Sequence, residues 1–345
     1  MEIEKVGAAI AYLRKRAGYT QKDLADRLGI SDKAVSKWER GLGLPDVTSL
    51  GKLSILLDTD TDSLLQGDII HHDQGWKGLL ILDDNPCGIG AGTMVYDKPL
   101  VYFLLSYFLL VGIKDIRCIV SERDRSFMER EFDGGRELGI HLSFGAGDDE
   151  SSDVECGVMT VFGRSIIYGV DQTRFFRKAM QSKSRLTILS LPRRGNTARR
   201  VFFNMDRKIV EEGIEEQLRT QYDYSDLPVM FSPASVVQSC KTSDDVRAAI
   251  ASYAEVNDIF TQVLDRGYVE FLLNDWNSVH NAAQFVRLVQ EACGMNIYCI
   301  EEVAWRRGMI GTEQLMKLGK KKKDTKYGEY ILDFGADIEF SGEKR

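Results

Sequence analysis

The spacing of apolar residues changes once along this chain of 345 residues, near Trp76. Before that point apolar residues recur at helical intervals, and after it short apolar runs alternate with helical segments. The run GLLIL (78–82) contains no polar side chain, which is typical of a strand covered on both faces. This alternation predicts an α/β, Rossmann-like domain with a mostly parallel or mixed sheet behind an all-α N-terminal domain.

The same patterns give the expected elements and boundaries. Strands are predicted at 78–82, 115–121, 140–144, 158–162, 186–191, 200–204 and 227–232. Helices of the second region are predicted at 99–112, 126–138, 172–182 and 243–265. The expected organisation is an N-terminal domain at 1–68, a linker at 69–75, a second domain at 76–334 and a tail at 335–345.

Two short helices of the N-terminal region are well delimited by the sequence. Thr20 is a predicted N-cap with Asp23 three residues on, and Gly29 ends that helix. Ser31 is placed to cap the next helix, whose inner face is Val35 and Trp38. A helix, a glycine turn and a second helix with an exposed polar face predict a helix-turn-helix.

The stretch TQKDLADRLGISDKAVSKWERGLGLPD closely resembles the Cro/repressor-type (XRE) DNA-binding family. That resemblance implies that the second helix lies in the major groove of double-stranded DNA. It assigns phosphate contacts to Gln21 and Ser36, and base-edge contacts to Asp32, Lys33, Ala34 and Lys37. Ser31 and Arg40 complete the predicted DNA-binding surface. The alternative is a protein–protein helical module with solvated charges.

The second domain resembles the sugar-phosphate nucleotidyltransferases, most closely the glucose-1-phosphate thymidylyltransferases. The segments that carry the resemblance are KGLLIL, VYDKPLVYFLLSYFLLVGIKDIRCIVSERD, LGIHLSF, FGRSIIYG, VNDIFTQVLDRG and the ending MNIYCIEEVAWRRGMIGTEQLMKLGKKKKDTKYGEYILDF. It spans about residues 76 to 334 with gaps. The resemblance implies a fold built to bind a nucleoside triphosphate and a sugar phosphate.

Several family positions carry other residues here. Asp83 and Asp84 replace two glycines of the phosphate loop, and Arg164 replaces an aspartate that would hold Mg²⁺. The loop arginine and lysine are missing, and Asp275 could supply the second metal carboxylate only through a shifted alignment. Nucleotidyl transfer depends on cationic neutralisation and positioning. These departures predict that the domain is not an enzyme, with no catalytic residue, cofactor or metal site.

The former site nevertheless supplies a predicted effector-binding set. Its members are Asp83, Asp84, Gly88, Gly90, Gly92, Thr93 and Arg164. The loop GIGAGT either cradles a phosphate with backbone N–H groups or is a flexible remnant. Arg164 either neutralises a pyrophosphate without metal or pairs with Asp83 or Asp84.

The sequence thus predicts a cytoplasmic DNA-binding transcriptional regulator that forms at least a homodimer or a tetramer. Its second domain would sense a nucleotide sugar or sugar phosphate, with a link to nucleotide-sugar or polysaccharide metabolism, or serve only for assembly. The alternative is an active or bifunctional nucleotidyltransferase with displaced ligands. A net charge of −7 restricts any DNA contact to a local surface, and no apolar run is long enough to span a bilayer.

Overall fold

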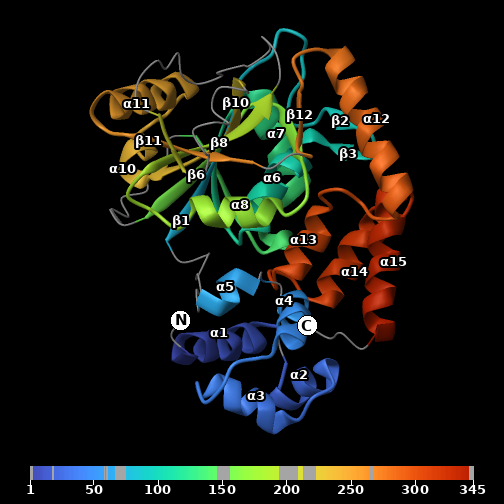
Figure 1. Ribbon diagram of the computed structural model, residues 1–345. Helices are drawn as coiled ribbons and strands as arrows, with labels where there is room; N and C mark the ends of the chain where they lie inside the picture. The colour runs from blue at the N-terminus through green and yellow to red at the C-terminus, as the bar shows by residue number, and fades with distance from the viewer. Residues whose placement is uncertain are drawn as a thin grey trace. The chain divides into compact units, whose positions relative to one another are not determined.

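The computed structural model describes residues 3–17, 19–57, 59, 61–66, 75–145, 156–193, 209–212, 223–264 and 267–341. The chain divides into two compact units, Met1–His71 and His72–Gly342 (Figure 1). The predicted linker at 69–75 lies almost entirely outside the described residues, and its bounds stay a prediction.

The first unit is all helical, as predicted. Its elements are α1 (Ile3–Arg16), α2 (Gln21–Leu28), α3 (Asp32–Glu39), α4 (Val47–Leu56) and α5 (Thr61–Gln66). Thr20 caps α2 in a reciprocal capping box with Asp23, and Gly29 follows in the left-handed conformation with φ of 70°. The side chain of Ser31 accepts from the N–H of Ala34 at the start of α3. The helix-turn-helix prediction is confirmed.

Two capping carboxylates of this unit should make its stability fall in acid. Hydrogen bonds, chiefly from the Thr20 and Thr48 hydroxyls, lower the pKa of Asp23 and of Asp46 below 3.8. A carboxyl group with a depressed folded-state pKa contributes stability above its unfolded pKa and loses it as the pH falls through the folded value. We expect the stability that these two caps contribute to be lost progressively below about pH 4.

The measurement is an acid titration of amide hydrogen exchange in α2 and α4, compared between wild type and Asp23→Asn/Asp46→Asn. The variant should lose protection less steeply with acid, because its caps no longer titrate. If protection in α2 and α4 falls equally steeply with acid in the wild type and the variant, titration of these two carboxylates does not cause the loss of stability.

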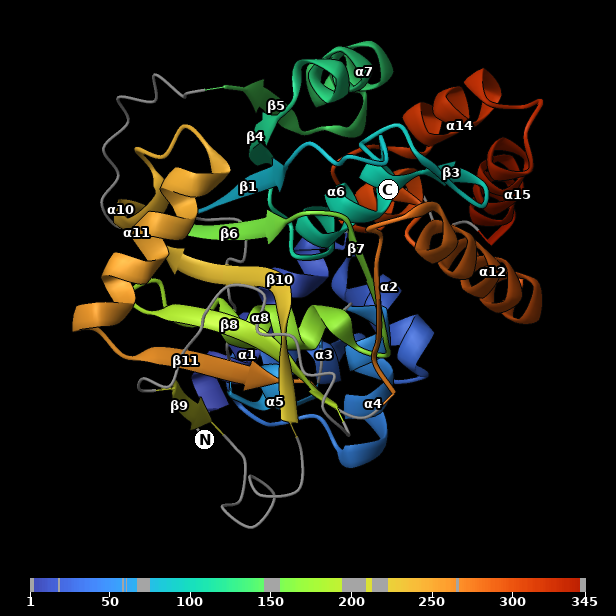
Figure 2. The same cartoon turned by 90° about the horizontal axis from the view of Figure 1, so that it is seen from above.

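The second unit is built on an eight-stranded mixed sheet, seen from above in Figure 2. The order of its strands is β5-β4-β1-β6-β10-β8-β11-β9. Their bounds are β1 (Trp76–Leu82), β4 (Asp115–Val120), β5 (His141–Phe144), β6 (Gly157–Phe162), β8 (Leu186–Arg193), β9 (Ile209–Glu212), β10 (Asp223–Pro233) and β11 (Ile259–Val263). Only β10 runs antiparallel to its neighbours, β6 and β8, among the strand pairs of this sheet in the described residues. The predicted fold class is confirmed.

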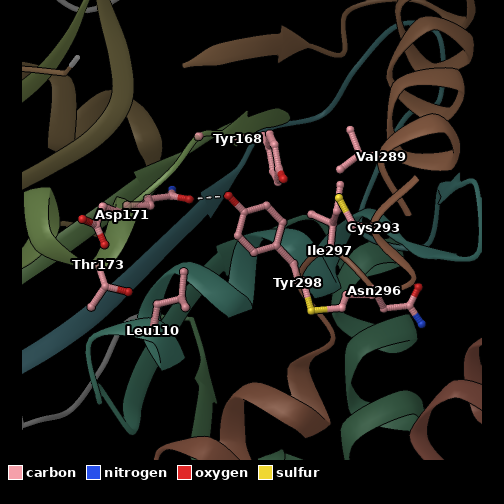
Figure 3. A pocket seen from close by; sticks show the side chains of 12 residues that line it. Leu110, Tyr168, Asp171, Thr173, Val289, Cys293, Asn296, Ile297 and Tyr298 are labelled. Atoms are coloured by element: carbon pink, nitrogen blue, oxygen red, sulfur yellow. Dashed lines mark hydrogen bonds between the residues drawn. The ribbon is translucent and has the colours of Figure 1, made fainter. Parts of the chain in front are cut away.

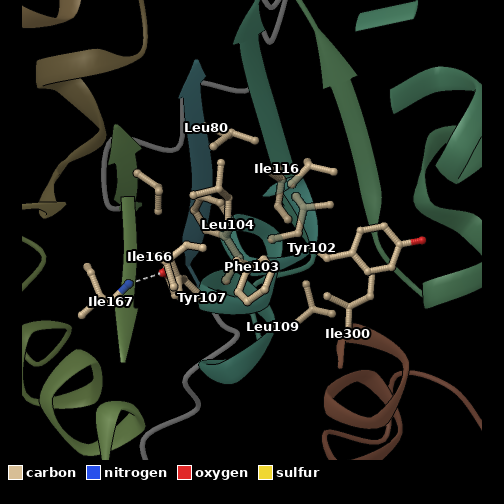
Figure 4. Close-up of a cluster of buried hydrophobic side chains, with 14 of the residues drawn as sticks. Leu80, Tyr102, Phe103, Leu104, Tyr107, Leu109, Ile116, Ile166, Ile167 and Ile300 are labelled. Carbon is tan, nitrogen blue, oxygen red and sulfur yellow. Dashed lines mark hydrogen bonds between the residues drawn. The ribbon is translucent and has the colours of Figure 1, made fainter. Parts of the chain in front are cut away.

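Both faces of β1 are covered, as its apolar run predicts. Leu80 and Leu82 belong to a core cluster that includes α6 (Leu100–Leu110), whereas Leu79 and Ile81 belong to a second cluster with α10 (Ala234–Val237) and α11 (Ser243–Val256). Figure 4 shows the first cluster, with Tyr107 pointing to Ile167. Helix α6 is buried around its whole circumference. The buried Tyr107 hydroxyl still has a hydrogen-bond partner, because it accepts from the Ile167 N–H at 2.8 Å.

The remaining elements complete the second unit. They are the short strands β2 (Met94–Val95), β3 (Lys98–Pro99), β7 (Ser165–Tyr168) and β12 (Val269–Leu272), and the helices α7 (Glu122–Phe132), η1 (Asp133–Leu138), α8 (Gln172–Ala179), α12 (Trp276–Cys293), α13 (Ile300–Arg306), α14 (Thr312–Lys321) and α15 (Lys326–Ser341). No helix in the described ranges has both the length and the apolar character to cross a membrane.

Two sequence predictions about these elements need correction, and a third falls on residues that the structure does not describe. The predicted helix at 243–265 is wrong at its end, because α11 stops at Val256 and 259–263 forms β11 beside β8. The predicted tail at 335–345 is helical through Ser341, since Ile338 is buried in the core. The predicted strand at 200–204 lies outside the described residues.

Candidate functional site

The exposed face of α3 carries the predicted DNA-reading residues. Ser31, Asp32, Lys33, Lys37 and Arg40 are exposed, and Ala34 and Ser36 are half-buried. On the opposite face, Val35 and Trp38 belong to the core of the unit. The helix therefore presents three cations along one accessible surface, as reading a groove requires.

Gln21, the predicted phosphate contact, is held by residues that sequence reasoning did not single out. Its Nε2 donates to Glu39 Oε2 at 2.7 Å. Glu39 in turn accepts from Arg14 Nε at 2.5 Å and from Arg14 Nη2 at 3.1 Å. The two charged side chains are only 9% and 7% exposed, so this ion pair joins α1 to α3 inside the unit. Nothing in the helical spacing of α1 distinguishes Arg14 from a solvated arginine.

The glycine-rich loop follows β1 and is closed by internal hydrogen bonds. The N–H of Gly88 donates to the Asn85 carbonyl at 2.8 Å, and that of Gly90 donates to Thr93 Oγ1 at 3.0 Å. The N–H of Ala91 donates to Asp124 Oδ1 at 3.0 Å. The N–H groups of Gly88, Gly90 and Ala91 thus already have partners within the chain.

The glycines of this loop allow α7 to pack closely against it. A Cβ on Gly90 would lie 2.3 Å from Asp124 Oδ1 and 2.4 Å from Arg123 Nη2, and one on Gly92 would lie 3.0 Å from the Phe127 ring. These distances are too short for any larger residue unless the side chains of Arg123, Asp124 and Phe127 move. The glycine spacing therefore has a packing role that the sequence alone did not reveal.

Arg164 and Asp83 come together, but not as the simple ion pair that was one predicted outcome. Arg164 Nη1 donates to the main-chain carbonyl of Asp83. The Asp83 carboxylate instead pairs with Arg247 Nη2 at 2.8 Å. Burial lowers the pKa of Arg164, against the opposing effect of nearby carboxylates, chiefly that of Asp83. Arg247 lies in the second turn of α11, far away in sequence.

Two other carboxylates of the predicted site have different surroundings. Asp84 is exposed at the end of β1. Asp275 caps α12, where its Oδ1 accepts from the Ser278 N–H at 2.7 Å, and this hydrogen bond lowers its pKa. Within the described ranges, no three His, Cys, Asp or Glu residues gather closely enough to hold a metal ion.

A separate cavity of about 360 Å³ opens at the end of β7. It is lined by Leu110, Tyr168, Gly169, Asp171, Gln172, Thr173, Val289, Cys293, Met295, Asn296, Ile297 and Tyr298. Figure 3 shows these side chains and the hydrogen bond from the Tyr298 hydroxyl to Gln172 Oε1. The rings of Tyr168 and Tyr298 meet edge to face with centroids 6.5 Å apart.

The cavity combines aromatic surface with polar groups that can accept or donate. Burial raises the pKa of Tyr298 well above its ordinary value, so its hydroxyl stays protonated. Asp171 is exposed and adopts the left-handed conformation with φ of 62°, which an aspartate tolerates. Apolar walls with a few polar groups suit a small organic ligand with hydroxyls. Sequence reasoning missed this cavity, because its walls come from four separate segments.

Comparison with known proteins assigns a different relative to each unit. Residues 10–64 match the sequence model of the family described as helix-turn-helix. The P22 c2 repressor, solved in complex with a synthetic operator, is 36% identical over 18% of this chain and 96% of its own, with a TM-score of 0.18.

The rest of the chain is similar to glucose-1-phosphate thymidylyltransferases. The protein of that name from Neisseria meningitidis serogroup A is 28% identical over 261 residues, which cover 69% of this chain and 89% of the relative. The one from Mycolicibacterium smegmatis is 26% identical over 270 residues, covering 72% of this chain and 93% of the relative.

These relatives contradict the prediction that the second domain is not an enzyme, since proteins similar to it over most of the chain are named for nucleotidyl transfer. The prediction considered charged groups only at the positions that align with the phosphate-loop and metal-binding residues of the nucleotidyltransferase family. The fold also brings Arg123, Asp124 and Arg247 to the carboxyl end of β1, from segments that no loop motif includes. The chain thus combines a helix-turn-helix DNA-binding domain with a domain similar to the glucose-1-phosphate thymidylyltransferases.

Proposed function

We propose that the protein is a transcriptional regulator whose DNA affinity is set by a ligand of its second domain. DNA binding is supported by the exposed polar face of α3, which carries Lys33, Lys37 and Arg40 on a capped, well-packed helix-turn-helix. Gln21, Ser31 and Ser36 would contact phosphates around it, and Asp32 and Ala34 would face base edges. One such module makes few contacts, so we propose a cytoplasmic homodimer that binds two half-sites.

We propose a nucleotide sugar or sugar phosphate as the effector, bound in the cavity lined by Tyr168, Asp171 and Tyr298. The names of the relatives supply the ligand class, and the cavity supplies aromatic and hydrogen-bonding surface for the sugar or base of such a ligand. Its volume lies within the usual range for small-molecule sites. The aromatic rings would pack on the apolar face of a sugar or base, and Asp171 would accept hydrogen bonds from hydroxyls. The target genes would then concern nucleotide-sugar or polysaccharide metabolism.

A thermal-shift panel of nucleotide sugars and sugar phosphates tests the effector. A ligand at 100 times its Kd should stabilise the protein by about 2.7 kcal/mol and raise its Tm by several degrees. Asp171→Asn keeps the left-handed backbone but weakens the charge-assisted hydrogen bonds, so it should reduce ligand affinity about tenfold. The exposed Asp333 supplies the control, and Asp333→Asn should shift like wild type.

If no compound shifts the wild-type Tm at millimolar concentration, the effector proposal is wrong. If Asp171→Asn and Asp333→Asn reduce the ligand affinity equally, the ligand binds outside this cavity.

A second candidate function is nucleotidyl transfer by the same domain, favoured by the 28% identity that extends over 69% of the chain. Pyrophosphate release from dTTP and glucose 1-phosphate in the presence of Mg²⁺ would support it, provided that Asp83→Ala or Asp275→Ala abolishes the release. Release no faster than in a protein-free control would contradict it.

A further inference from the structure

A dense group of lysines lies where α14 meets α15, two helices that pack against each other (Figure 1). Residues 317–326 hold six lysines against one aspartate, in a chain whose net charge is −7. Lys321 pairs with Glu137 at 2.6 Å. Four further exposed lysines make no ion pair with any described residue, and together they are called the lysine patch: Lys317, Lys320, Lys323 and Lys326.

The sixth lysine of the segment fixes the turn that carries the patch. Lys322 Nζ donates to the buried Glu301 Oε1 at 3.0 Å. The Lys322 carbonyl accepts from the Thr325 N–H at 3.0 Å, and Thr325 Oγ1 accepts from the Gly328 N–H at 3.0 Å. A Cβ on Gly328 would lie only 2.0 Å from the Lys322 carbonyl oxygen, so only glycine permits this approach. The patch is therefore presented from a backbone that is held in place.

The arrangement of the patch charges costs stability. Lys317 and Lys320 lie three positions apart on one face of α14, where like charges repel. The helix dipole favours cations in a last turn, which accounts for Lys320, but it disfavours Lys326 in the first position of α15. Charges that are locally unfavourable and lack a partner in the described structure indicate a function rather than a contribution to stability.

The patch suits the backbone of a nucleic acid better than a lipid surface. None of the large apolar side chains exposed in the described residues lies in α14 or α15, so the patch lacks the apolar anchor of a membrane-binding helix. Duplex DNA presents closely spaced phosphates, which lysines bind without reading the sequence. Because both units belong to one chain, DNA bound by α3 also raises the effective concentration of duplex near the second unit.

We propose that the lysine patch binds phosphates of the duplex outside the sequence that α3 reads. This inference rests on DNA binding by the first unit, and it adds a second, sequence-independent contact from the nucleotidyltransferase-like domain. Such a contact strengthens binding to all sequences alike. It therefore raises the affinity and its salt dependence and leaves the sequence selectivity unchanged.

The test compares two duplexes bound by the full-length chain: the selected recognition sequence alone, and the same sequence lengthened on both sides by arbitrary sequence. At low salt the wild type should bind the long duplex about tenfold more tightly than the short one. Lys320→Gln/Lys323→Gln/Lys326→Gln should lose most of that gain. On the long duplex, its slope of log K against log salt should be shallower by about 2 to 3, since each lost phosphate contact removes about 0.9.

The matched control removes the same charge from three exposed lysines elsewhere in the second unit, in Lys114→Gln/Lys178→Gln/Lys241→Gln. It should keep the gain on the long duplex and the salt slope of the wild type.

Three results would overturn the proposal: no gain from the added sequence in the wild type, a gain that the patch variant retains, or an equal loss in the control variant. The last result would mean that net charge alone governs the effect. Failure of DNA reading is seen separately on the short duplex. If the wild type does not bind that duplex selectively, α3 does not read DNA and this inference fails with it. Selective binding to the short duplex without a gain on the long one contradicts only the lysine patch.

Discussion

Reversing the charges of Lys33 and Lys37 lowers the affinity for a selected DNA duplex about 100-fold. Both side chains are exposed on α3, on the face opposite the buried Val35 and Trp38. Each reversal removes an attraction to the anionic duplex and adds a repulsion, while the core of the unit is untouched. The measurement is fluorescence anisotropy with duplexes enriched from a random-sequence pool, at several salt concentrations.

The control for this prediction is Lys52→Glu, which makes the same charge change at an exposed position of α4. It should weaken binding only slightly, and the slope of affinity against salt should stay close to that of wild type. A comparable loss in Lys52→Glu would mean that total charge, and not the face of α3, governs binding.

Truncating Glu39 to alanine should destabilise the first unit by about 3 kcal/mol. The carboxylate accepts from Arg14 at 2.5 Å and from Gln21 at 2.7 Å, and its removal leaves a buried guanidinium without its partner. Hydrogen exchange in α1 to α3 of the full-length chain should report the loss. DNA affinity should fall as well, because Gln21 loses the group that orients it.

The matched variant is the double substitution Arg14→Met/Glu39→Met. Replacing both charges with apolar side chains of similar length leaves no orphaned ion, so most of the stability should return. If the single and double variants are equally destabilised, the pair acts through packing and not through charge.

Much of the fold could be predicted from local sequence, and particular residues show why. Thr20, Gly29 and Ser31 act on neighbours within three or four positions, so α2 and α3 could be delimited without the tertiary structure. The apolar run of β1 likewise predicts that this strand is buried. By contrast, 259–263 continues the pattern of α11, and only pairing with β8 on one side and β9 on the other makes it a strand.

The candidate sites were less predictable, because they depend on contacts between distant segments. Asp124 follows Ser121 at the spacing of a helix cap, yet its carboxylate bonds to Ala91 in the glycine-rich loop. Arg247 reaches Asp83 across more than a hundred residues of sequence. Charge counting at aligned positions could not include either of these contacts.

Ligand control of DNA binding is tested by measuring the DNA affinity of the full-length protein with and without the nucleotide sugar that gives the largest thermal shift. Anisotropy at fixed salt should show sequence-selective binding whose Kd changes about fivefold or more with ligand, and the change should be lost in Asp171→Asn at the same ligand concentration. Absence of sequence-selective DNA binding, or a Kd unaffected by a ligand that clearly binds, would contradict a ligand-controlled regulator.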